Sequence, residues 1–95
     1  MHELTLANNI LNITRRVAQE NSLSRVTGIT IKLGIWSCVN EESLKFALHC
    51  IANEPWIKGV NLKVEKIEQE DIIQEMYIES IEGEKNEDKS IEAHS

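Results

Sequence analysis

The sequence predicts an α+β fold in which two helices pack on one face of a three-stranded mixed β-sheet, in the order α-β-α-β-β. Two segments carry apolar residues at the spacing of an amphipathic helix, and three others read as strands because apolar residues alternate with polar or small ones. The 95 residues are enough for one small domain. Aromatic residues make up only 4%, so we expect an aliphatic core.

The first element is expected to be a helix from Leu4 to about Asn21. Its inward positions are apolar or small, and they are Leu6, Ala7, Ile10, Leu11, Ile13, Thr14, Val17 and Ala18. A half-buried strand is predicted next, within residues 26–35. Its alternating apolar positions are Ile29, Ile31, Leu33 and Ile35.

The second helix is expected to follow Asn40, whose side chain suits the N-cap position. Glu41 and Glu42 come next, and their carboxylates favour the positive N-terminal end of a helix. The sequence Asn-Glu-Pro at residues 53–55 ends this helix.

Two further strands are predicted, at residues 60–67 and within the apolar segment 72–81, joined by the charged connection 68–71. Beyond Gly83 the chain is too polar to order itself. We therefore expect a folded domain at residues 1–82 and a polar, disordered tail at residues 83–95.

Charge is unevenly distributed along the chain. Ten Lys and Arg against sixteen Asp and Glu give a net charge of −6, of which residues 1–64 contribute +2 and residues 65–95 contribute −8. This balance excludes a basic nucleic-acid stripe. No apolar run approaches the roughly 20 residues of a membrane span, and the N-terminus lacks the features of a secretory signal. We expect a cytoplasmic protein that binds neither nucleic acid nor membrane.

No residue constellation predicts an enzyme. The glycines are isolated, so there is no phosphate-binding loop, and of His2, His49 and His94 only His2 has a suggestive context. Cys38 and Cys50 lie twelve residues apart, which matches neither a zinc knuckle nor a redox pair. We expect these two cysteines to be small, half-buried hydrophobic residues.

The two tryptophans lie just outside the predicted elements, and each would suit an interface anchor or a cap on the small core. We favour the core for Trp36. For Trp56, which follows Pro55 in a turn, we favour the surface.

The start of the chain carries a pattern that suits metal binding. The α-amino nitrogen of Met1, the amide nitrogen of His2 and the His2 imidazole lie within one short span. Three nitrogens so arranged suit square-planar Ni(II) or Cu(II), and Glu3 would add an oxygen or balance the charge of the ion. From these residues alone, the alternative is a solvated histidine at a frayed end.

Several segments share the pattern of a known family. They are MHELTLA at residues 1–7, RVTGITIKLG at 25–34, VNEESLKFA at 39–47, GVNL at 59–62 and YIESIE at 77–82. These segments resemble the HypA/HybF family of hydrogenase nickel-insertion proteins, and the likeness covers about residues 1–67 and 76–82.

The resemblance implies that nickel is held by the terminal amine of Met1 and by His2, with help from Glu3. It also implies a supporting ligand in the loop before the second helix, where this chain has Asn40. Asn40 offers only a neutral amide oxygen, and its position favours a helix cap over a ligand.

One departure from the family is large. Members carry a zinc domain with two CxxC pairs between the second and third strands, whereas here residues 67–72 form a short connection and no CxxC occurs. Zinc is therefore not expected. In a smaller departure, Ile35-Trp36 stands where the family more often has an acidic residue, which removes a polar group near the metal-site loop.

The resemblance implies a nickel-binding metallochaperone and not an enzyme. It would deliver Ni(II) during maturation of [NiFe]-hydrogenase, and sometimes of urease. The implied partners are a HypB-type GTPase and the hydrogenase large-subunit precursor, and a homodimer is left open. The alternative is a paralogue without the zinc domain that acts as a metal-independent protein–protein adaptor.

Overall fold

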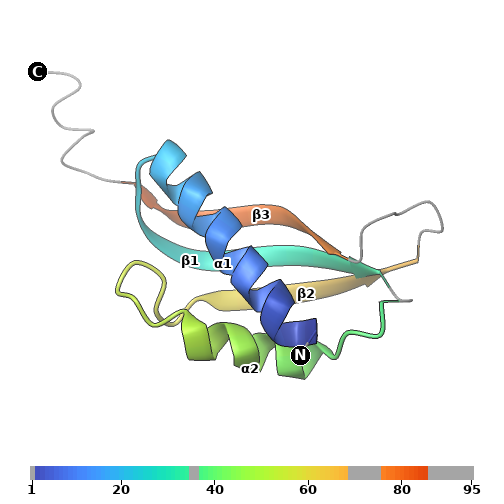
Figure 1. Cartoon of the computed structure of the whole chain (residues 1–95). Coiled ribbons are helices and arrows are strands. Elements are labelled where there is room, and N and C mark those ends of the chain that lie inside the picture. Colours follow the sequence, from blue (N-terminus) through green and yellow to red (C-terminus); the bar gives the residue numbers. More distant parts are fainter. Residues whose placement is uncertain (1, 35–36, 69–75, 86–95) are drawn as a thin grey trace, which may run out of the picture.

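The computed structural model describes residues 2–34, 37–68 and 76–85. The elements follow the predicted order, α-β-α-β-β (Figure 1). They are α1 (His2–Glu20), β1 (Leu23–Gly34), α2 (Glu41–Ile51), β2 (Asn61–Ile67) and β3 (Met76–Lys85). Within the described residues, no helix is long and apolar enough to cross a membrane.

The strands form one mixed sheet in the order β2-β1-β3, so β1 is central. β1 runs parallel to β2, from Gly28 opposite Asn61 to Gly34 opposite Ile67. Parallel neighbours need a crossover connection, and α2 supplies it. β1 runs antiparallel to β3, and both helices lie on one face of the sheet (Figure 1). The predicted fold class is confirmed.

The core lies between the helices and this face of the sheet, and it is aliphatic, as predicted. Fully buried side chains from both helices, from β1 and from the α2–β2 loop meet there, among them Ile10, Val26, Ile29, Ile31, Leu33, Leu44, Leu48, Ile57 and Val60. The alternation predicted for β1 is confirmed at Ile29, Ile31 and Leu33, whereas Ile35 lies outside the described residues.

Backbone pairing extends β1 and β3 beyond the segments in which apolar residues alternate. β1 begins at Leu23, opposite Lys85 of β3, and the Ser24 hydroxyl donates to the Glu84 carbonyl at 3.2 Å. β3 therefore continues through Lys85, past the expected boundary at residue 82. Gly83 is required there, because a Cβ at this position would lie 2.3 Å from the Arg25 carbonyl oxygen.

Both cysteines are exposed, so the expectation of half-buried side chains was wrong. Cys50 lies on α2, whose buried side chains are Leu44 and Leu48, and it therefore faces outward. Cys38 lies in the loop before α2 and has a φ of 63°.

Trp56 is partly buried against the core and not simply at the surface. Its indole N–H donates to Glu54 at 2.6 Å, and the Arg15 guanidinium lies 5.6 Å from the ring centre. The indole hydrogen bond, reinforced by Arg15, lowers the pKa of Glu54. The α2–β2 loop is thus fixed to α1. Trp36 lies outside the described residues.

The sheet face without helices is polar and carries an ion network centred on Lys32. Its ammonium group pairs with Glu65 on β2 and with Glu79 on β3, the latter at 3.5 Å. The hydrogen bond to Glu65 raises the pKa of Lys32, and the same bond lowers the pKa of Glu65. One side chain of the central strand therefore links both edge strands.

This network predicts a pH-dependent stability. Glu65 stabilises the fold above its ordinary pKa of 4.5, and this contribution is lost as the pH falls through the lowered value. Protonated Lys32 stabilises the fold at pH values below its ordinary pKa of 10.5. This contribution is lost as the pH rises through the raised pKa of Lys32 in the folded protein. Thermal unfolding should therefore show a lower Tm for Glu65→Gln than for the wild type at neutral pH, and equal values in strong acid. A difference that persists in acid would contradict this assignment.

Thr14 is the exception in an otherwise apolar interface. Its side chain is fully buried, and its hydroxyl has no hydrogen-bond partner among the described residues. A buried hydroxyl without a partner costs about 1–3 kcal/mol. Thr14→Val should therefore raise the free energy of unfolding by about 1 kcal/mol in urea titrations. Thr14→Ser, which keeps the hydroxyl and loses a methyl group, should lower it.

Candidate metal centre

Glu3 and Asn40, two residues of the predicted nickel site, lie at one end of the molecule. The N-terminal ends of α1 and α2 lie side by side there, next to the carboxyl ends of β1 and β2 (Figure 1). In open sheets, the region outside the carboxyl ends of parallel strands is a common ligand-binding position. The topology thus brings the start of the chain to the loop before α2.

Glu3 joins the two helices at this end. It lies in the first turn of α1, and its Oε2 accepts a hydrogen bond from the backbone N–H of Asn40 at 3.1 Å. Leu6 and Ala7, one turn further along α1, are buried in the core and hold the helix in place. Two residues of the predicted site, 37 positions apart, are therefore in direct contact.

Asn40 is the N-cap of α2, as its sequence context predicted. Its side-chain oxygen accepts from the Ser43 N–H at 2.9 Å, and its carbonyl accepts from the Leu44 N–H at 3.0 Å. The backbone at Asn40 is extended, with φ −84° and ψ 121°. The amide oxygen that the family resemblance offers as a metal ligand is therefore engaged by the helix.

The remaining predicted ligands lie at the start of α1. His2 is the first residue of that helix, where the leading backbone amides have no intrahelical acceptor. The His2 amide nitrogen is therefore not needed by the α1 hydrogen-bond ladder. Met1 and the side chain of His2 lie outside the described part of the structure.

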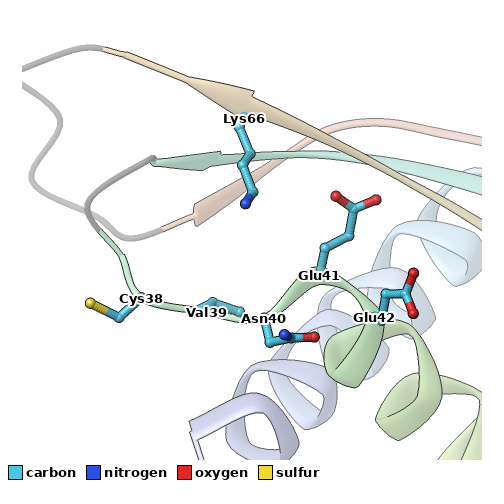
Figure 2. A pocket seen from close by; sticks show the side chains of 6 residues that line it. All are labelled: Cys38, Val39, Asn40, Glu41, Glu42 and Lys66. Atoms are coloured by element: carbon cyan, nitrogen blue, oxygen red, sulfur yellow. The ribbon is translucent and has the colours of Figure 1, made fainter.

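An open hollow of about 460 Å³ lies beside Asn40 (Figure 2). Its lining residues are Cys38, Val39, Asn40, Glu41, Glu42 and Lys66. Figure 2 shows Lys66 extending from β2 toward the loop before α2, Glu41 rising from the first turn of α2, and the Cys38 thiol pointing away from both glutamates. The hollow is polar, with two carboxylates and one ammonium group.

Cys38 and Lys66 were not singled out by the sequence as neighbours of the site. The available signal was the predicted order of elements, because a parallel β2 would bring its end beside the loop that leaves β1. Among the side chains that the structure describes, no three His, Cys, Asp or Glu residues form a group that could hold a metal ion.

Residues 1–74 match the family model described as hydrogenase/urease nickel incorporation, metallochaperone, hypA. The hydrogenase maturation factor HypA of Escherichia coli K12 is 34% identical over 70 residues, which cover 74% of this chain and 60% of that protein. HypA of Methanobrevibacter smithii is 31% identical over 67 residues, which cover 70% of this chain and 54% of that protein. The chain belongs to the HypA family.

The fold is also found in a solved member of the family. The solution structure of the Ni metallochaperone HypA from Helicobacter pylori matches with a TM-score of 0.76, covering 88% of this chain and 98% of that one. The identity is only 11%, so this likeness concerns the fold alone. The chain spans 54–60% of the length of the two curated relatives described above.

Proposed function

We propose that this protein is a metallochaperone that binds Ni(II) at its N-terminus and delivers it during maturation of a [NiFe]-hydrogenase. The observation that carries the proposal is the family match, which begins at residue 1 and includes the Met-His-Glu start. The contact between Glu3 and Asn40 supports it, because that contact holds the start of the chain against the loop before α2.

The proposed ligands are the amine of Met1 together with the amide and imidazole nitrogens of His2. Nitrogen donors in a planar arrangement suit Ni(II). Glu3 follows these ligands directly in the sequence, and its carboxylate accepts a hydrogen bond from the backbone N–H of Asn40. A chelate at a chain end suits a delivery protein, because the end can exchange its ligands and release the ion without unfolding the domain.

The proposed recipients are the hydrogenase large-subunit precursor and, as a second case, urease. The proposed partner is a HypB-type GTPase, and the proposed location is the cytoplasm. The protein itself would bind and transfer the ion and catalyse no reaction. Zinc has no part in the proposal, because the 95 residues contain no CxxC pair.

Complementation tests the delivery role. The gene would be deleted in its own host, and hydrogenase activity would be measured at low nickel after re-expression of the wild type or of His2→Ala. At low nickel we expect the wild type to restore hydrogenase activity and His2→Ala to fail. At excess nickel we expect hydrogenase activity with either protein, because mass action then supplies the ion. Equal rescue by both at low nickel would instead identify a metal-independent adaptor, and no rescue by the wild type would refute the delivery role.

A further inference from the structure

We infer that Glu3 is a positioning residue whose carboxylate holds the metal-binding start of α1 on the N-terminus of α2, and that it acts on nickel through this contact and not as a ligand. The inference rests on the proposed function. It assigns a separate role to a residue that, by the family resemblance, helps to hold the nickel.

The donor in this contact is held in a fixed direction. The N–H of Asn40 points to Glu3, while the side chain and the carbonyl of Asn40 are both engaged by the first turn of α2. Val39, the preceding residue, is buried in the core. The backbone around the donor is therefore constrained on both sides.

Electrostatics favour the same arrangement. The N-terminal end of a helix carries partial positive charge, so a carboxylate acceptor is stabilised there. A hydrogen bond to a charged group is also stronger than one between neutral groups. The contact thus combines a charged acceptor with a donor at the positive end of α2, an eleven-residue helix.

The contact has a direct consequence for the neighbouring residue. His2 precedes Glu3 in the first turn of α1, so fixing Glu3 restricts how far the two terminal residues can fray. Restricting a binding segment before the ion arrives lowers the entropy lost on binding.

The test compares two substitutions of Glu3 by Ni(II) titration and by the visible absorption of the bound ion. Glu3→Ala removes the acceptor, and we expect nickel affinity to fall about tenfold, as for other groups that orient metal ligands. Glu3→Gln keeps a carbonyl acceptor for the Asn40 N–H, and we expect it to retain most of the affinity. The absorption per bound nickel should be the same in both variants and in the wild type, because the ligands are unchanged.

Two further variants isolate the contact. Asn40→Ala removes the side-chain cap of α2 and leaves the backbone N–H that donates to Glu3. Asn40→Pro removes both the cap and the N–H. Proline should fit the backbone here, because the φ of −84° at Asn40 lies close to the range that proline adopts. Glu3→Ala should therefore weaken nickel binding in the Asn40→Ala background and have no further effect in the Asn40→Pro background. Glu20→Gln, which removes an exposed carboxylate at the far end of α1, serves as the matched control and should bind as the wild type does.

Three results would overturn the inference. If Glu3→Gln is as weak as Glu3→Ala and the absorption changes, the carboxylate is a ligand and the inference is wrong. If Glu3→Ala binds as tightly as the wild type, the contact does not position the site. If the wild type itself does not bind nickel, the proposed function fails, and the inference fails with it.

Discussion

Replacing His2 with alanine is expected to weaken Ni(II) binding by more than about 100-fold, because a lost ligand should cost more than the 10–100-fold typical of a lost orienting group. The substitution removes the imidazole, one of the three proposed nitrogen donors. Alanine is the best helix former, so α1 should still begin at the same place. Calorimetric nickel titration would measure the affinity, and circular dichroism would establish that the fold is intact.

His94→Ala is the matched control, since it removes a histidine far from the N-terminus in the sequence. We expect this variant to bind nickel as the wild type does. Equal, tight binding by His2→Ala and the wild type would show that the imidazole of His2 is not a ligand.

Replacing Ile31 with alanine is expected to lower the free energy of unfolding by about 3–4 kcal/mol, within the range for buried isoleucine truncations. Ile31 is fully buried on the central strand. Its backbone neighbours are Val64 on β2 and Ile78 on β3, so the surrounding sheet cannot easily close the cavity. Urea unfolding followed by circular dichroism would give the free energy.

Phe46→Ala provides a control of similar chemistry. Phe46 lies on α2 with 71% of its surface exposed, and its loss should change stability by no more than about 0.5 kcal/mol. If the two substitutions had similar effects, the central position of Ile31 in the core would be wrong.

The fold class was predictable because each element has a strong local pattern. The inward face of α1 and the alternation along β1 need no knowledge of the tertiary structure. The alternation was confirmed at the three described positions of β1. Of the eight inward positions predicted for α1, the structure buries Leu6, Ala7, Ile10, Thr14 and Ala18 and packs Leu11 partly against the core, whereas Ile13 and Val17 are only half-buried. The strand ends were less predictable. Leu23 to Arg25 and Gly83 to Lys85 carry little apolar alternation, and they are strands because β1 and β3 pair there through backbone groups.

The degree of burial of some single residues also escaped prediction. Cys50 was expected to be half-buried, yet the outward face of α2 depends on the exact helix register, which Leu44 and Leu48 set. Trp56 was placed at the surface from its turn context. It is partly buried because it packs against the core, and it also contacts Arg15, which is remote in the sequence.

At the candidate site, the local role of Asn40 was predictable from the sequence, whereas the contact between Asn40 and Glu3 was not. The N-cap role of Asn40 follows from local sequence and was confirmed. The hydrogen bond between Glu3 and Asn40 depends on how α1 packs beside α2, which no local pattern specifies. The same packing, together with the parallel pairing of β2, brings Lys66 to the hollow.

The most direct test of the terminal chelate leaves every side chain in place. Nickel titration would compare the chain carrying a free amine on Met1 with the same chain extended by one glycine before Met1. The account predicts one tightly bound Ni(II) for the free chain and affinity lower by more than about 100-fold for the extended one, because the terminal amine is no longer adjacent to His2. Equal affinity of the two chains would contradict the account.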